Sequence, residues 1–303
     1  MRALYGPGLA DVEASHYQAV LLRRQAAPAQ AGTATQTQAA PALFRVLGPL
    51  EVSTPCGEPV AVRRRQHRAT LTALLLHAGQ FCSRAWLIPT VWETPPESGP
   101  ASLRAAIYGL RRALGDPLAN RIQTHQAGPR AGGYLIMAVG AEVDLLAFRA
   151  LSQAGRAAYD RGDAALAARE LGEARRLWRG HPFPDLSPTP AVAAELDRLR
   201  EERLDAEDTW IDARLALGQH HEVARDLREI LAADPLREHG WAQLMLALAR
   251  SGDQAGALEA YDTARAVMAA EYGSGPGPEL AEMRRQVQAG AADLLMPAAP
   301  CPG

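Results

Sequence analysis

The chain has 303 residues, of which 48% are hydrophobic, and its formal net charge is -2. Two domains are expected at this length. No apolar run is long enough to span a membrane, and the N-terminus lacks the pattern of a secretory signal. The three cysteines (Cys56, Cys82 and Cys301) match neither a disulfide framework nor a zinc motif, which indicates the cytoplasm.

The charge is distributed unevenly along the chain. All the basic residues are arginines, because the sequence contains no lysine. Residues 42–140 hold 11 arginines against five acidic residues, whereas residues 141–303 hold 18 against 27. A basic module followed by an acidic one predicts that the first meets an anion such as DNA. Residues 1–41 are rich in Ala, Gln, Thr and Pro near their end and are expected to form a flexible tail.

Residues 42–140 are predicted to contain short strands, three helices and a β-hairpin, in that order. "LFRVLGPLEV" and "EPVAV" have strand character. A helix follows from the "RRRQHR" stretch to Gly79, and Ser83 is expected to cap a second helix. A third helix spans residues 99–114, ended by Gly115, and the hairpin lies within Arg121 to Met137.

Residues 141–290 are predicted to be almost wholly helical, with a repeat. Gly218 and Gly252 align at a spacing of 34 residues, the tetratricopeptide period, and Gly162 aligns with them less strongly. Glycine suits the tight turn between two paired helices, and such pairs stack to bury their apolar faces. Residues 291–303 are expected to form a second flexible tail. The fold class is therefore mainly α with small β elements: a module of strands, three helices and a hairpin, followed by a tetratricopeptide-like all-α domain.

The helix over residues 99–114 has two chemically different faces. Leu103, Ile107, Leu110 and Leu114 share one face, which we expect to be buried. The other side is the predicted DNA-binding face, and an ordinary solvated helix face is the alternative. Small residues there permit close approach to base edges, and arginine reaches guanine or phosphate. The residues of this side are Ala101, Arg104, Ala105, Tyr108, Arg111 and Arg112.

Further basic residues lie near the first helix and the hairpin. Arg63, Arg64, Arg65 and Arg68 have the unfavourable sign for a helix N-terminus, a conflict that an external phosphate would relieve. His125 and Arg130 lie near the hairpin tip, where a wing would touch the DNA backbone or minor groove.

Other motifs favour structural roles. The "RGD" at residues 161–163 is expected to be an inter-helix turn, and the tryptophans at 178, 210 and 241 are expected to pack in the core. His220 and His221 lack a third metal ligand, and "GSGPGPEL" lacks the lysine of a P-loop. With no defensible catalytic set, we expect neither an enzyme, a metal nor a cofactor.

The two halves together resemble the Streptomyces antibiotic regulatory protein family. "FRVLGPLEV", "LIPTVW", "LRRALG" and "GYLI" are similar to the winged helix of OmpR-type regulators. "VDLLAFRAL", "ARRLWRG" and "HGWAQLMLALARSGDQAGALEAYDTAR" are similar to the bacterial transcriptional activation domain. The resemblance implies a nucleoid-associated activator of antibiotic biosynthesis genes. It would bind direct repeats in double-stranded promoter DNA near the -35 element as two protomers, and recruit RNA polymerase holoenzyme, including its sigma factor.

The resemblance also implies that residues 42–140 form a winged helix-turn-helix domain, with the recognition helix at residues 101–114 and the wing at residues 121–137. Two residues depart from the family pattern. Pro89 falls inside the second helix, where an interior proline costs about 3 kcal/mol unless the helix bends or starts late. Gly109 stands where the family often has arginine, and it weakens the helix by about 1 kcal/mol relative to alanine. A different class of function, a helical-repeat adaptor whose basic module docks an acidic protein, remains the alternative.

Overall fold

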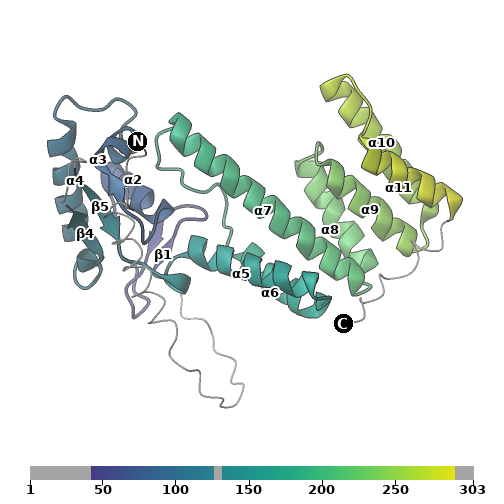
Figure 1. Ribbon diagram of the computed structural model, residues 1–303, viewed down its shortest axis with the longest axis horizontal. Helices are drawn as coiled ribbons and strands as arrows, with labels where there is room; N and C mark the ends of the chain where they lie inside the picture. The colour runs from purple at the N-terminus through teal and green to yellow at the C-terminus, as the bar shows by residue number, and fades with distance from the viewer. Residues whose placement is uncertain (1–41, 126–131, 291–303) are drawn as a thin grey trace, which may run out of the picture. The chain divides into compact units, whose positions relative to one another are not determined.

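The structure is a computed structural model that describes residues 42–125 and 132–290 (Figure 1). The two predicted tails, residues 1–41 and 291–303, lie outside the described residues, as does Arg130. None of the described helices combines the length and apolar character needed to cross a membrane.

The first part of the described chain forms the predicted order of strands, helices and hairpin. Strands β1 (Phe44–Arg45) and β2 (Glu51–Val52) pair antiparallel. Helices α2 (Arg65–Leu76), α3 (Arg84–Val91) and α4 (Gly99–Leu114) follow, with β3 (Cys82–Ser83) between the first two. After the 3-10 turn η1 (Leu118–Arg121), strands β4 (Ile122–His125) and β5 (Gly133–Ile136) form the hairpin. The resulting antiparallel sheet has the order β3-β5-β4.

Local sequence signals explain several of these boundaries. The Ser83 hydroxyl accepts a hydrogen bond from the Trp86 amide at 3.2 Å, which confirms the predicted cap of α3. Gly115 has φ +64° and ends α4, as expected for a residue that tolerates a left-handed conformation. Pro89 lies inside α3, and the helix nevertheless continues to Val91.

The second part of the described chain consists of helices in consecutive pairs. After the short turn η2 (Gly140–Glu142), the helices are α5 (Asp144–Asp160), α6 (Ala164–Arg176), α7 (Pro190–Ala216), α8 (His220–Ala233), α9 (Glu238–Arg250), α10 (Gln254–Tyr272) and α11 (Pro278–Ala289). Gly162, Gly218 and Gly252 lie between the members of three successive pairs with φ of +80°, +79° and +84°. The predicted repeat and its glycine turns are confirmed, and "RGD" is one of those turns.

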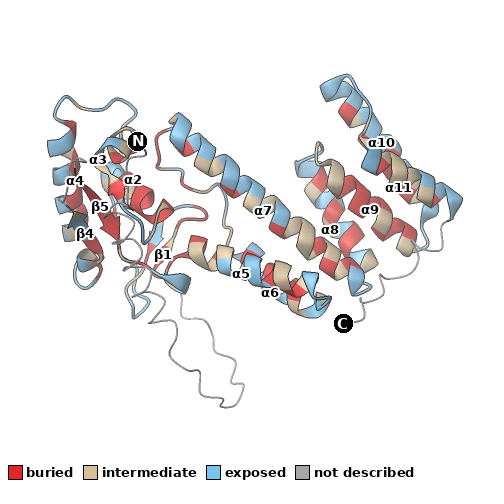
Figure 2. Ribbon diagram, in the orientation of Figure 1, coloured by how far each residue is buried: buried red, intermediate tan, exposed pale blue. Residues whose placement is uncertain are grey.

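Two hydrophobic cores meet within α7 (Figure 2). The first runs without interruption from the strands and α2–α4 into α5, α6 and most of α7, as far as Ala213. The second joins the end of α7 to α8–α11. Trp241 is buried in the second core, Trp178 packs on the first, and Trp210 packs on both, as their predicted core role requires. Core residues such as Ala138 and Val143 lie on either side of the exposed Gly140, so the first core continues across the predicted domain boundary.

A strap between α6 and α7, residues 179–189, is hydrogen-bonded to the winged-helix part. The amide of Arg179 donates to the Leu47 carbonyl at 2.7 Å, and the amide of Ser187 donates to the Thr90 carbonyl at 3.0 Å. The guanidinium of Arg68 on α2 pairs with Asp185 of the strap at 2.8 Å. These contacts join residues that are 97 to 132 positions apart in the sequence, so they hold the two parts together as one unit.

Candidate nucleic-acid interface

Helix α4 presents the two faces that its sequence predicts. Leu103 and Leu110 are fully buried, and Ile107 and Leu114 are 2% and 4% exposed. These side chains pack into the first core, whereas the opposite side faces solvent. Tyr108 is 66% exposed, so its ring faces solvent. The other exposed members of the face are Ala101, Arg104, Ala105 and Arg112.

Arg111, at the edge of this face, is engaged within the protein. Its guanidinium donates to the Ile122 carbonyl at 2.7 Å and to the Thr124 hydroxyl at 3.0 Å. Both acceptors belong to β4, so Arg111 ties the hairpin to α4. Its role in this structure is to hold the wing, a contact that helix periodicity alone could not reveal.

The start of α2 carries an uncompensated positive charge. Arg63, Arg64 and Arg65 are exposed, the helix has no side-chain cap, and its first turn contains no acidic residue. Free amide groups and arginines in one place favour an anion. Arg68 differs from these three, because its Nε and Nη2 donate to Asp185 and its Nη1 donates to the Arg63 carbonyl. The Arg68 guanidinium, which we expected to bind phosphate, is therefore paired with Asp185 of the strap.

Phe81 lies beside the hairpin, although it was not among the residues predicted from the sequence. His125, at the end of β4, meets the ring of Phe81 edge to face, with 6.1 Å between ring centroids. Phe81 is 51% exposed and precedes β3, the strand that pairs with β5. The sequence shows only that Phe81 is an apolar residue next to a strand. The sheet order β3-β5-β4 is what places Phe81 beside the hairpin.

Gly109 allows α4 to lie close to α2. A Cβ atom on Gly109 would come within 2.5 Å of the His67 Nε2 atom, so the His67 ring would have to move to make room for it. Burial, with a smaller effect from Arg64, lowers the pKa of His67, which favours the neutral ring. The glycine at this position is therefore explained by a helix contact.

The described residues contain no group of three or more His, Cys, Asp or Glu side chains that could hold a metal ion. Burial raises the pKa of the Cys82 thiol to about 12, so within this part of the chain that cysteine stays protonated at neutral pH and is a poor nucleophile.

Comparison with known proteins decides the family. Residues 57–135 match the family described as transcriptional regulatory protein, C terminal, and residues 143–288 match the bacterial transcriptional activator domain. Regulatory protein DnrI of Streptomyces peucetius is 32% identical over 252 residues, which cover 80% of this chain and 91% of that protein. The chain belongs to the Streptomyces antibiotic regulatory protein family. It is a DNA-binding transcriptional activator of this type, with the winged helix followed by the activator domain.

Other members of the comparison are longer than this chain. Regulatory protein AfsR of Streptomyces griseus is 35% identical over 257 residues, which cover 84% of this chain but only 25% of AfsR. A solved structure of Mycobacterium tuberculosis EmbR, in complex with a low affinity phosphopeptide, superposes with a TM-score of 0.73 at 30% identity. That match covers 81% of this chain and 64% of the EmbR chain. The regulator described here thus corresponds to the part that these proteins share.

Proposed function

We propose that this family member places α4 in the major groove of promoter DNA and reads base edges there. The observation that carries the proposal is the exposed side of α4, where small residues alternate with a tyrosine and two arginines above a fully buried apolar face. The major groove, about 12 Å wide, admits an α-helix. Arg104 and Arg112 have the geometry to bind guanine or phosphate, and Ala101 and Ala105 can touch thymine methyl groups.

Phosphate contacts would come from both sides of α4. Arg63, Arg64 and Arg65 lie at the uncapped start of α2, where backbone amides also favour phosphate. His125, at the end of β4, would add a contact from the hairpin. Arg130, which lies outside the described residues, is the second wing residue that the sequence predicts. Arg68 and Arg111 act as positioning residues, because their guanidinium groups hold the strap and the hairpin.

Membership of the family supports a specific promoter arrangement. Two protomers would bind direct repeats near the -35 element, about one helical turn or 10 to 11 bp apart. They would engage RNA polymerase holoenzyme, including its sigma factor, at genes of antibiotic biosynthesis. We expect the strap to hold the helical part in a set orientation beside the DNA-bound winged helix, which would favour regular contacts between neighbouring protomers.

A gel-shift titration of the full chain tests the proposal. We expect tighter binding to the native promoter than to a scrambled sequence, with affinity that falls steeply as salt rises. Arg112→Ala should weaken binding to the native promoter by about 1 to 3 kcal/mol if Arg112 contacts a base. Arg176→Ala is the matched control, because Arg176 is an exposed arginine of α6 with a local partner, Glu173.

Two outcomes would contradict the proposal. Equal affinity of Arg112→Ala and the wild type would show that this side of α4 does not face the bases. Binding to DNA with one half-site as tightly as to the direct repeat would argue against tandem protomers.

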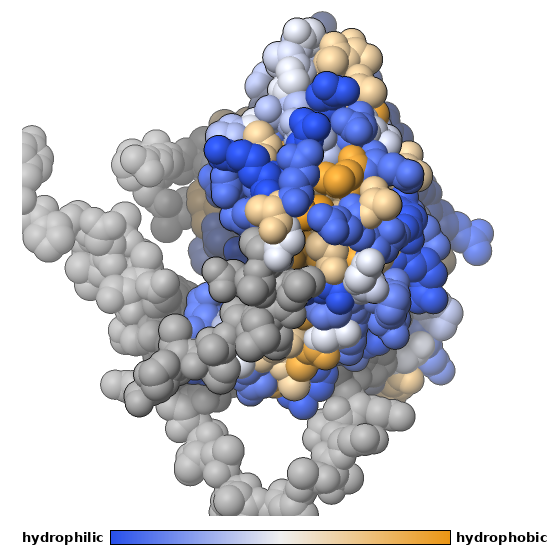
Figure 3. Space-filling view, turned by 90° about the vertical axis from the view of Figure 1, so that its right-hand side faces the viewer, coloured by the Kyte–Doolittle hydropathy of each residue, from blue (hydrophilic) through white to orange (hydrophobic). Residues whose placement is uncertain are grey.

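The adaptor alternative predicts no preference between promoter and scrambled DNA in the same assay. A protein-docking surface commonly exposes a contiguous apolar patch of several hundred Å². On the face in Figure 3, hydrophobic residues form only small separate patches among hydrophilic ones. This face is the right-hand side of Figure 1, where α10 and α11 lie, so the gel shift and not this view decides whether the basic module docks an acidic protein.

A further inference from the structure

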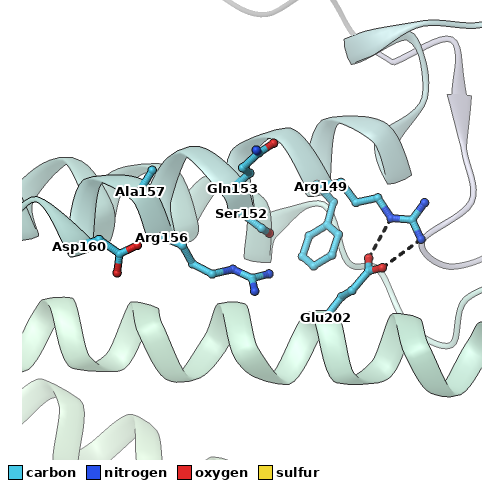
Figure 4. Close-up of a pocket in the computed structure, with 8 residues that line it drawn as sticks. Arg149, Ser152, Gln153, Arg156, Ala157, Asp160 and Glu202 are labelled. Carbon is cyan, nitrogen blue, oxygen red and sulfur yellow. Dashed lines mark hydrogen bonds and ion pairs between the residues drawn. The ribbon is translucent and has the colours of Figure 1, made fainter. Parts of the chain in front are cut away.

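The ion pair between Arg68 and Asp185 resembles a pair in the helical part but lies in a different place. The Nε and Nη2 atoms of Arg68 donate to one carboxylate oxygen of Asp185, at 2.9 and 2.8 Å. Between α5 and α7, the same two atoms of Arg149 donate to Glu202, at 2.8 and 3.2 Å (Figure 4). The Glu202 pair stays within the helical part, whereas the Asp185 pair joins the strap to the start of α2.

The Arg68 guanidinium reaches back to the start of α2. Its Nη1 donates at 3.1 Å to the carbonyl of Arg63, which lies two residues before the helix begins. This end of α2 has no side-chain cap and no acidic residue in its first turn, and the arginines at positions 63–65 are exposed there. The Arg68 side chain is itself 35% exposed. Released from Asp185, it would be a fourth arginine within reach of a phosphate at this end of the helix.

The strap holds the Asp185 carboxylate in a fixed position. Phe183 and Leu186, on either side of it in the sequence, are 2% and 9% exposed and belong to the first core. The Leu186 amide donates to the Phe183 carbonyl at 3.2 Å, so Asp185 lies inside a tight turn. Its side chain is only 13% exposed. The carboxylate is therefore a fixed anion beside the arginines of α2 and not a freely moving surface charge.

A carboxylate and a DNA phosphate require the same edge of an arginine. The planar guanidinium offers Nε and Nη2 as a fork that suits either anion. In Arg68 both of these atoms already donate to Asp185. Each arginine that binds a phosphate displaces counterions, and it steepens the slope of log affinity against log salt by about 0.9. Whether Arg68 holds Asp185 or a phosphate thus has a measurable effect on DNA binding.

We propose that Asp185 is an internal anion that withholds Arg68 from the DNA backbone and so limits the affinity of the chain for DNA of any sequence. This inference rests on the proposed function, because it requires the start of α2 to lie beside the DNA. The strap lies within the match to the activator domain, residues 143–288. The activator domain therefore sets how strongly the winged helix holds the phosphate backbone.

Gel shifts of the full chain over a range of salt concentrations test the proposal. Asp185→Asn keeps the shape of the side chain and removes its charge. We expect promoter and scrambled DNA to bind more tightly by the same factor, about 3- to 10-fold at low salt, with a salt slope steeper by about 0.9. Asp185→Ser, a second neutral variant, should give the same result. Thermal denaturation identifies the variants that are folded at the assay temperature.

Two further variants show whether the gain comes from Arg68. Glu202→Gln changes the net charge by the same amount and frees Arg149, whose side chain is 37% exposed, from its pair in the helical part. It should bind DNA as the wild type does. The double variant Asp185→Asn/Arg68→Met removes both charges of the other pair. It should also match the wild type, because neither charge of that pair contacts phosphate in the wild type.

The proposal fails if the neutral variants of Asp185 bind with unchanged affinity and salt slope. An equal gain in Glu202→Gln would assign the effect to net charge, and a gain that persists in the double variant would exclude Arg68 as its source. A double variant that binds more weakly than the wild type would show that Arg68 already contacts DNA. Failure of the proposed function is distinct, because the wild type itself would then show no preference for the promoter over scrambled DNA.

Discussion

At the scale of single residues, Gly109 shows why a local rule can mislead. By helix propensity alone, a glycine inside α4 costs about 1 kcal/mol relative to alanine. In the structure, however, the His67 ring fills the space that a side chain would need. Because α4 carries the proposed DNA-binding face, its close approach to α2 sets how far that face projects.

The cost of a side chain at Gly109 should depend on His67. We expect Gly109→Ala to lower the free energy of unfolding by about 1 to 3 kcal/mol, since overpacking outweighs the gain in propensity. In a His67→Ala background the same change should raise it by up to about 1 kcal/mol, because the obstructing ring is gone. Urea denaturation of the four proteins of this double-mutant cycle measures both signs.

A stabilising effect of Gly109→Ala in both backgrounds would contradict the close contact. His67→Ala alone is the control, because it reports the cost of the lost ring without a new side chain on α4.

At the scale of elements, the recognition helix and the wing behave as a connected pair. Arg111 links the last turn of α4 to β4, and β5 joins β4 to β3 at the start of α3. Hairpins with only four residues in each strand are weak by themselves. The hairpin orientation therefore depends on this side chain as well as on strand pairing.

Arg111→Ala should separate positioning from base contact. Loss of the bonds to Ile122 and Thr124 should lower the free energy of unfolding by about 0.5 to 1.5 kcal/mol per bond. Affinity for promoter and scrambled DNA should fall by similar factors, because a misplaced wing affects phosphate contacts on any sequence. Thermal denaturation and gel shifts measure the two effects.

Arg112→Ala is the matched comparison for that experiment. It should leave the thermal transition unchanged and reduce affinity for the promoter more than for scrambled DNA. The same profile for both variants would contradict the different roles assigned to these neighbouring arginines.

Helix α7 is the element that joins the two hydrophobic cores. Near its end, the guanidinium groups of Arg175 and Arg214 both contact the Trp210 ring, at 4.9 and 4.4 Å from the ring centroid. Arg175 comes from α6, so this cation–π contact adds to the packing of α6 on α7. The helix thus links the winged-helix side of the chain to the later repeats.

At the scale of the whole molecule, Asp144 connects the start of α5 to the winged-helix part. Its buried carboxylate accepts hydrogen bonds from the amides of Val46 and Leu47 at 2.8 to 3.0 Å. Burial raises the pKa of Asp144, and the two amides and Arg179 partly offset that rise. The same amides would lack a partner without this side chain, so β1 depends on a residue in the other family domain.

Asp144→Ala should weaken both parts together. We expect a loss of about 1 to 3 kcal/mol for each amide left unsatisfied. Because the first core runs from β1 into α7, hydrogen exchange should show protection falling in α4 and α5 alike. Asp160→Ala, at the exposed end of the same helix, should change neither.

Loss of protection in α4 with α5 unaffected would contradict a shared cooperative unit. It would show that the winged helix unfolds independently despite the strap and the continuous core.

Short-range patterns account for much of the fold. The spacing of Leu103 to Leu114 predicted the buried face of α4, and the aligned glycines predicted the turns between helix pairs. Short-range patterns predicted less of the candidate nucleic-acid interface. Arg68 and Arg111 were predicted to contact phosphate because they are arginines near a helix, but their hydrogen-bond partners lie on other elements. The contact of Phe81 with His125 depends on the sheet order, which the sequence pattern does not show.

Periodicity, capping residues and turn glycines act within a few positions, so the sequence by itself determined the order of elements and which side of α4 faces outward. Tertiary structure alone decided which arginines are engaged, why Gly109 stands in α4, and how the two family domains share a core. The reason is distance along the chain. The contacts Val46–Asp144 and Arg68–Asp185 span 98 and 117 positions, and no local pattern encodes a hydrogen bond between residues that only folding brings together.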